Sequence, residues 1–426
     1  MSLIFYLYFL LNNVCGAILV VNQIDDHHII SKLSDVQYRY YGFWTILYTI
    51  VSFPIGQLLA NNIFYKKNMA MLYNYYLSLP IMSEPKKISS HVKGTLLILS
   101  LLSLLAVLYT LAVIGGSPLR SLISGADVMD MALMRAEAKS NFGGNEYIRN
   151  IFGLTLTPFL SYVAYGYKTL KNSRFNRLWF WTMFVSSVLI LTYDLEKGPA
   201  LFYLLGFLFF KVYLGYKLSN KILITIGGCI LGLIVAMYLV LSTYDISGMF
   251  VFNQGIIGRM TLSSNAGVFM SYEVFPKSHD FLGFSSFSNV LNDLFGLPHN
   301  ERAARIVMEH VNPSGVSAGI AGVYNSLFVS EAWANWGLVG VILSPVYVGF
   351  IIQCLYLFLL KNKKTPFFIA LFVVYTIRCS INGGINDYIY NVSTVVMIIV
   401  YYFTYHFGIF NSSKKRINEN YCIPSR

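Results

Sequence analysis

The chain has 426 residues, of which 56% are hydrophobic and only 12% are charged. A water-soluble domain of this length needs more polar surface than this composition supplies, so the composition argues against a soluble protein and indicates a membrane protein. The net charge of +12 fits either a nucleic-acid-binding surface or the charge asymmetry of a membrane protein. The distribution of the charges along the chain decides between the two.

Apolar stretches long enough to cross a membrane recur along the whole chain. A spanning helix needs roughly 20 apolar residues. Such stretches lie near residues 3–23, 41–62, 94–115, 150–170, 178–194, 199–216, 222–244, 333–360, 366–381 and 390–410. The sequence therefore predicts an all-α polytopic membrane protein with about ten transmembrane helices. Residues 1–426 are expected to form a single membrane domain, because no linker, repeat or low-complexity segment divides them.

The basic residues predict how these helices are oriented, because Lys and Arg accumulate in cytoplasmic loops. With the N- and C-termini in the cytoplasm, 19 of the 31 basic residues but only two of the 19 acidic residues lie inside. Membrane orientation thus explains the net charge, and we expect membrane lipids but no nucleic acid among the partners. Eight of the 12 outer basic residues are Arg, whereas 15 of the 19 inner ones are Lys. Because arginine binds phosphate bidentately, this predicts a phosphorylated ligand outside, unless these arginines pair with the outer acidic residues.

Two outer loops are long enough to fold into structures of their own. The first covers residues 116–149, and the second, residues 245–332, directly precedes the eighth helix. A short amphipathic helix is predicted over residues 301–311, and the run Asn312-Pro313-Ser314-Gly315 ends it. The spacing of Glu301, Arg305 and Glu309 places them on one face of this helix. Ion pairs within a solvated helix explain these charges as well as a ligand site does.

The segment that opens the eighth helix reads Glu331-Ala332-Trp333-Ala334-Asn335-Trp336-Gly337-Leu338-Val339-Gly340. A carboxylate and an amide at the outer end of a membrane helix are costly unless they are paired or face a polar cavity. Glu331 and Asn335 are therefore expected to point into the bundle. The two glycines are expected to let neighbouring helices pack closely.

This segment and the preceding run Asn312-Pro313-Ser314-Gly315 resemble the Wzy-type O-antigen polymerases, which join oligosaccharide repeat units. Two further pieces fit that family: Arg259 followed by Tyr272, Glu273, Phe275 and Pro276, and Lys197-Gly198-Pro199 at the outer start of a span. The motifs cover about a quarter of the chain, whereas the hydropathy profile covers all of it. The resemblance implies a multi-pass protein of the bacterial inner membrane. Such a protein transfers a growing glycan from undecaprenyl diphosphate to a lipid-linked repeat unit on the periplasmic face.

The resemblance also gives roles to charged residues of the outer loops. Arginines would stabilise the leaving diphosphate, and the residues expected to bind it are Arg135, Lys197, Arg259, Arg302, Arg305 and Arg378. The residues expected to accept the proton of the attacking hydroxyl are His310, Glu301 and, as a further candidate, Glu331. His310 comes first because imidazole titrates near neutral pH, although a histidine at a helix C-terminus also stabilises the helix without any catalytic role. Asn312 and Asn335 are expected to position the substrate.

The expected partners are an undecaprenyl-diphosphate-linked glycan donor and acceptor, with a chain-length regulator left open. No cofactor or metal is expected, and the five cysteines form no CxxC pair. Three other functions stay open. Asp25-Asp26 and Asp194-Leu195-Glu196 also fit a metal-dependent GT-C glycosyltransferase. A basic polytopic chain fits a flippase or transporter of lipid-linked sugars, although no paired half-chain repeat is visible. The outer-loop His and Arg residues fit an O-antigen ligase as well.

Overall fold

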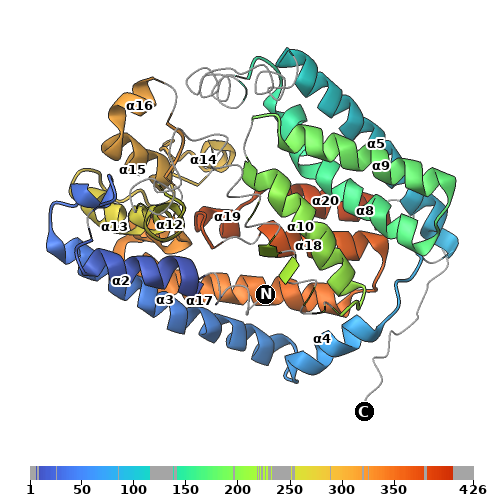
Figure 1. The fold of residues 1–426 in the computed structure, drawn as a ribbon, viewed down its shortest axis with the longest axis horizontal. Helices are drawn as coiled ribbons and strands as arrows, with labels where there is room; N and C mark the ends of the chain where they lie inside the picture. Colours follow the sequence, from blue (N-terminus) through green and yellow to red (C-terminus); the bar gives the residue numbers. More distant parts are fainter. Residues whose placement is uncertain are drawn as a thin grey trace.

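The computed structural model describes residues 9–24, 26–84, 86–115, 142–194, 197–217, 255–287, 289–318, 321–324, 326–378 and 381–405, together with a few single positions. These residues form helices and connecting segments without any β-strand, apart from an isolated bridge between Leu327 and Asn382 (Figure 1). The predicted all-α architecture is therefore confirmed for this part of the chain. Most of the predicted seventh span and most of the predicted loop 116–149 lie outside the described residues.

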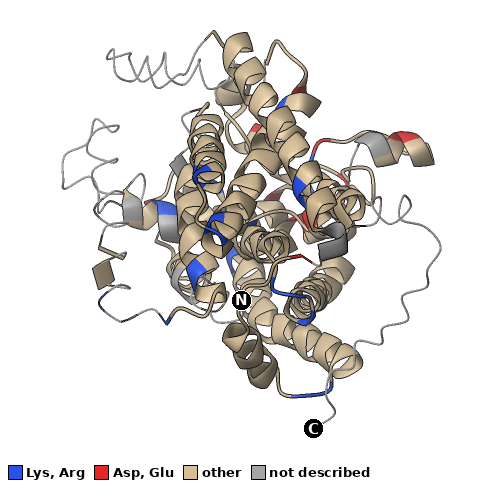
Figure 2. Cartoon of the chain, turned by 90° about the vertical axis from the view of Figure 1, so that its right-hand side faces the viewer, with Lys and Arg blue, Asp and Glu red and all other residues tan. Residues whose placement is uncertain are grey.

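Among the described residues, four helical segments are long and apolar enough to cross a membrane. They are α3 (Val36–Phe64), α5 (Lys86–Val113) from Ser89 onward, α17 (Phe328–Lys361), and Asn386–Tyr405, which comprises α19 (Asn386–Ile389) and α20 (Val392–Tyr405). Shorter apolar helices overlap α2 (Cys15–Val21), α10 (Lys197–Tyr213) and α18 (Pro366–Arg378). Figure 2 shows that few positions along the helices carry a charge. This is the architecture of a membrane-embedded helical protein.

The other described helices are shorter or lie between these segments. Helix η3 (Ile148–Leu156) continues directly into α8 (Thr157–Leu170), and α9 (Arg174–Leu191) follows, at the positions of the predicted fourth and fifth spans. The remaining elements are η1 (Phe9–Val14), η2 (Ile30–Lys32), α4 (Met69–Ser78), α12 (Ile256–Gly258), η5 (Arg259–Ser263), α13 (Ser264–Val274), α14 (Asn289–Phe295), α15 (Ala303–Val311) and α16 (Pro313–Ser317).

The described helices pack around two separate hydrophobic cores. The first core contains buried rings such as Phe53 and Phe269. The helices around it form what we call the first packing unit: η1, α2, α3, α13, α15 and most of α17. The second packing unit comprises α5, α8, α9, α10, α18 and α20 around rings such as Phe159 and Phe372. The two units lie on the left and on the right of Figure 1. α17 joins them, because its last turn, at Leu359 and Leu360, belongs to the second core.

α3 and α17 pack closely because glycines allow their backbones to approach. A Cβ on Gly56 of α3 would overlap the carbonyl oxygen of Val346, and one on Gly349 of α17 would overlap that of Phe53. Small residues at such crossings permit close backbone contact between membrane helices. This pair of helices forms the frame against which the shorter helices α2, α13 and α15 of the first packing unit pack.

α17 is interrupted at Gly337, so the glycine-rich segment has a second role besides helix packing. Gly337 has φ +57° and ψ −139°, a backbone conformation that residues with a side chain rarely adopt. The chain turns so sharply there that a Cβ on Gly340 would overlap the carbonyl oxygen of Ala332. Residues 328–336, which we call the front segment of α17, therefore point in a different direction from the long apolar part that follows. The predicted span at 333–360 misses this break.

Candidate functional site

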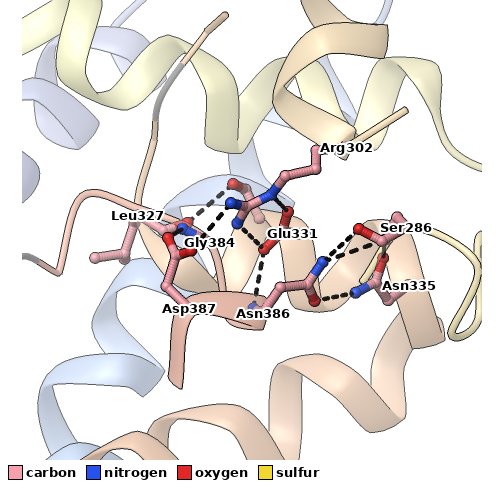
Figure 3. Close-up of polar contacts among 9 residues, drawn as sticks. Ser286, Arg302, Leu327, Glu331, Asn335, Gly384, Asn386 and Asp387 are labelled. Carbon is pink, nitrogen blue, oxygen red and sulfur yellow. Dashed lines mark hydrogen bonds and ion pairs between the residues drawn. The ribbon is translucent and has the colours of Figure 1, made fainter. Parts of the chain in front are cut away.

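A cluster of polar side chains lies where α15, the front segment of α17 and α19 meet (Figure 3). Arg302 occupies the N-cap position of α15, and Glu331 lies in the first turn of α17. Arg302 donates from Nε to Oε1 of Glu331 at 2.8 Å and from Nη2 to Oε2 at 3.0 Å. This is the bidentate geometry of a strong arginine–carboxylate pair. The Glu331 side chain is only 5% exposed, so the pair fixes the guanidinium from its buried side.

A second carboxylate binds the same guanidinium from α19. Nη1 of Arg302 donates to Oδ1 of Asp387 at 3.0 Å, and Oδ2 of Asp387 accepts from the backbone N–H of Gly384 at 3.3 Å. The side chains of Arg302 and Asp387 are 40% and 41% exposed, so this half of the cluster faces solvent. Burial lowers the pKa of Arg302, but the hydrogen bonds and charges of Glu331 and Asp387 outweigh that effect and hold the pKa above its usual value. The guanidinium is therefore charged throughout the physiological pH range.

Buried amide and hydroxyl groups extend the cluster behind Glu331. The backbone N–H of Asn386 donates to Oε2 of Glu331 at 3.1 Å, and Nδ2 of Asn335 donates to Oδ1 of Asn386 at 3.1 Å. Ser286 donates from Oγ to Oδ1 of Asn335 at 2.9 Å and accepts at its carbonyl from Nδ2 of Asn386 at 3.0 Å. Ser286, Asn335 and Asn386 are each at most 3% exposed. We call Ser286, Arg302, Glu331, Asn335, Asn386 and Asp387 the polar cluster. Buried polar groups are retained in a membrane protein at a cost, which makes this cluster the candidate site.

Backbone contacts fix the segments that supply these side chains. The N–H of Phe328 donates to the carbonyl of Ile381 at 2.9 Å, which fastens the α18–α19 connection to the start of α17. Gly384 in that connection lies so close to the ion pair that a Cβ would overlap Oε2 of Glu331 and Nη2 of Arg302. Only glycine therefore leaves room for the pair at this position.

The segment that carries Ser286 runs along the front segment of α17. The N–H groups of Leu282 and Gly283 donate to the carbonyls of Ala334 and Asn335, both at 2.9 Å. The rings of Phe284 and Phe287 pack edge-on against Trp336, with centroids 5.6 and 5.7 Å apart. The ring of Trp333 likewise contacts the ring of Phe281, with centroids 5.5 Å apart. Both tryptophans at the start of α17 thus hold the segment that carries Ser286 in place.

Of the residues predicted from the sequence, Arg302, Glu331 and Asn335 come together in the polar cluster. The predicted burial of Glu331 and Asn335 is confirmed, at 4% and 1% exposure. Arg305 lies one turn further along α15, where it pairs with Glu309 at 3.2 Å and donates to the carbonyls of Ala321 and Gly322 at 2.9 and 3.0 Å. Arg305 thus ties the chain beyond α16 to α15.

The residues predicted first as proton acceptors lie outside the polar cluster. α15 begins at Ala303, two residues later than predicted, so Glu301 precedes the helix, and Arg305 pairs with Glu309 instead. His310 lies at the opposite end of α15 from Arg302, about 12 Å away along the helix axis at 1.5 Å per residue. Glu301 and His310 are both exposed and form no hydrogen bond or ion pair within the described part of the chain.

The other predicted site residues are dispersed. Asn312 caps α16 by accepting from the N–H of Gly315 at 3.1 Å, which gives it a role in folding. Arg259 is exposed at the start of η5, and Arg378 is exposed at the end of α18, where it donates to the carbonyl of Leu154 at 3.0 Å. Arg135 and the side chain of Lys197 lie outside the described residues.

Half of the polar cluster was not predicted from the sequence. Ser286 lies in a connecting segment, and Asn386 and Asp387 lie in the short helix α19, between the apolar stretches of the sequence, where no helical periodicity draws attention to them. The run Asn382-Gly383-Gly384-Ile385-Asn386-Asp387 gave only a weak signal, because glycine, amide and carboxylate residues between two apolar stretches are typical of any turn or loop.

The described residues contain no group of three or more His, Cys, Asp or Glu that could hold a metal ion. What the cluster offers chemically is a fixed, partly exposed guanidinium next to a partly exposed carboxylate.

The chain matches no protein-family model, no curated protein and no solved structure.

Proposed function

We propose that this chain polymerises undecaprenyl-diphosphate-linked oligosaccharide repeat units by glycosyl transfer at the outer face of the bacterial inner membrane. In this proposal ten helices cross the membrane and both termini are cytoplasmic, so the polar cluster faces the periplasm. The observation that carries it is Arg302, which two carboxylates hold beside the end of a membrane-length helix while 40% of its side chain stays exposed. The resemblance of the surrounding motif to Wzy-type polymerases supplies the substrate class.

The reaction needs hydrogen-bond donors for the leaving diphosphate, and Arg302 can supply them. A guanidinium has five N–H groups, and the cluster uses Nε, one N–H of Nη1 and one of Nη2. The remaining two can reach phosphate oxygens from the exposed edge. The two carboxylates of Glu331 and Asp387 exceed the single positive charge of Arg302, so Arg302 contributes directed hydrogen bonding and no net positive charge. We propose Arg259, exposed at the start of η5, as one of the cations that balance the diphosphate charge.

The buried side of the cluster supports catalysis by preorganisation. Donors that are already oriented stabilise developing charge without reorganising during the reaction. Asn386, Asn335 and Ser286 form a continuous chain of hydrogen bonds behind Glu331. This chain fixes the carboxylate of Glu331, which in turn orients the guanidinium of Arg302 through two hydrogen bonds.

The experiment that tests the proposed function is gel analysis of surface polysaccharide in a strain that lacks this chain. We expect lipid A core with a single repeat unit, because units are still made, flipped and ligated but not joined. Core without any unit would instead indicate a ligase. An absence of repeat units at the outer face of the membrane would indicate a flippase. Either of these outcomes, or unchanged polymer, overturns the proposal.

Complementation with variants links the function to the cluster. Arg302→Lys keeps the positive charge but loses the fork that contacts Glu331 and Asp387 together, so we expect polymer to stop at one unit. Arg174→Lys changes an exposed arginine at the N-terminus of α9 and serves as the matched control. Full-length polymer in the Arg302→Lys strain would exclude Arg302 from the reaction.

A further inference from the structure

The two carboxylates that share Arg302 differ in what they can still bind. Oε1 of Glu331 accepts from Nε of Arg302, and Oε2 accepts from Nη2 and from the backbone N–H of Asn386. The Glu331 side chain is also 5% exposed, so a substrate hydroxyl cannot reach it. Asp387 accepts one hydrogen bond at each oxygen, from Nη1 of Arg302 and from the N–H of Gly384, and is 41% exposed.

A general base must lie within hydrogen-bond reach of the proton that it takes. A carboxylate offers about four lone-pair sites, so Asp387 has about two left after its two hydrogen bonds, on the side that faces solvent. Its position is also fixed, since Arg302 and Gly384 hold both oxygens. The same geometry places the unused N–H groups of Arg302 next to it, so one site presents a proton acceptor and phosphate-binding donors together.

We propose that Asp387 is the proton acceptor of the glycosyl transfer and that Glu331 is a positioning residue. This assignment rests on the proposed function. The oxygen of the acceptor sugar's hydroxyl forms a bond to the anomeric carbon of the growing glycan as its proton passes to the carboxylate of Asp387. The bond between the anomeric carbon and the diphosphate oxygen breaks, and its electron pair leaves with undecaprenyl diphosphate, to which the N–H groups of Arg302 donate.

The assignment separates the two carboxylates experimentally. Asp387→Asn keeps the size of the side chain and an oxygen for Arg302, gives up only the longer 3.3 Å contact with the N–H of Gly384, and removes the base. Glu331→Gln places an NH₂ group against the N–H donors of Arg302 or Asn386, so it disturbs the arrangement itself. Asp387→Asn should therefore reduce the rate with little change in stability or binding, whereas Glu331→Gln should lower the unfolding temperature as well.

The test uses the purified full chain in liposomes with synthetic undecaprenyl-diphosphate-linked repeat units. We expect Asp387→Asn to reduce kcat by about 100-fold or more, the usual contribution of a general base, with binding of undecaprenyl diphosphate and the unfolding temperature close to wild type. Asp387→Glu should recover part of the rate because it restores a carboxylate.

Three results would overturn the assignment. One is an Asp387→Asn rate within a few-fold of wild type, which would leave the proposed function intact. Another is an Asp387→Asn protein in which weaker binding of undecaprenyl diphosphate and a lower unfolding temperature account for the whole loss of rate. Asp387 would then have a structural role. An inactive wild-type chain under conditions where substrate binds would overturn the proposed function and the assignment with it.

Discussion

Replacing Gly384 by alanine tests the geometry of the polar cluster without changing any of its side chains. The added Cβ would overlap Oε2 of Glu331, far inside the 3.0 Å that real Cβ contacts essentially never undercut. Oε2 accepts two hydrogen bonds, from Nη2 of Arg302 and from the N–H of Asn386. A hydrogen bond to a charged group contributes about 1.5–3 kcal/mol. Because Arg302 is partly exposed and water can replace a lost contact, we expect the lower end for each bond, and hence a loss of about 3 kcal/mol in the free energy of unfolding.

The assay is thermal unfolding of the detergent-purified protein, combined with polymer length in the complemented strain. Gly384→Ala should lower the unfolding temperature by several degrees and reduce the polymer to one repeat unit. Gly143→Ala is the matched control, because a Cβ there would meet nothing within 4 Å. A Gly384→Ala protein with the unfolding temperature and polymer length of wild type would refute the reasoning, since the ion pair would then tolerate displacement.

Three further predictions concern stability. His27 is fully buried, and burial lowers its pKa from 6.5 to about 4. Because the unfolded chain therefore binds a proton at higher pH, stability should be complete above pH 6.5 and fall by up to about 3 kcal/mol as the pH drops to about 4. Unfolding at pH 4.5 and 7 should reveal this loss in wild type and less of it in His27→Gln. Lys364 is buried and donates to three backbone carbonyls at the end of α4, at 2.6 to 3.2 Å, so Lys364→Met should cost about 3 kcal/mol in thermal unfolding monitored by circular dichroism. Gly337→Ala should lower the free energy of unfolding by about 1–3 kcal/mol through backbone strain alone. It should also shift the fluorescence of the tryptophans in the front segment of α17. An unchanged spectrum and melting curve would show that the break tolerates a side chain.

The helices could be predicted from the sequence because lipid imposes a simple requirement on it. A spanning helix must present about 20 apolar residues in a row, and the four membrane-length helical segments of the described residues overlap predicted stretches for that reason. The same cost argument predicted that Glu331 and Asn335 would be buried and hydrogen-bonded, because neither side chain is tolerated in contact with lipid.

The pairing of the charged residues could not be predicted, because it depends on distances between segments far apart in the chain. Spacing along a helix offered Arg305 two acidic partners, Glu301 and Glu309, and the actual start of α15 at Ala303 leaves only Glu309 within the helix. Arg302, next to Glu301 in sequence, instead reaches Glu331 and Asp387 across loops. Local periodicity contains no information about such contacts.

The break in α17 illustrates a different limit. The sequence places a glycine at position 337 but does not say whether that glycine serves close packing or a backbone conformation. Both explanations apply in this helix, since Gly349 packs against α3 whereas Gly337 adopts a positive φ. The distinction matters because the break turns the front segment, with Glu331 and Asn335, away from the axis of the apolar part.

The origin of the two carboxylates explains why the cluster should serve catalysis more than stability. Glu331 lies on α17 of the first packing unit, and Asp387 lies on α19, in a connection that leads from α18 to α20 of the second unit but packs Ile381 and Ile385 into the first core. A partly buried ion pair adds little net stability, because desolvation offsets the attraction, but it imposes a defined geometry. Arg302 therefore fixes the connection between α18 and α20 against the front segment of α17. A site that must hold a lipid diphosphate and a sugar hydroxyl together needs such a fixed relation.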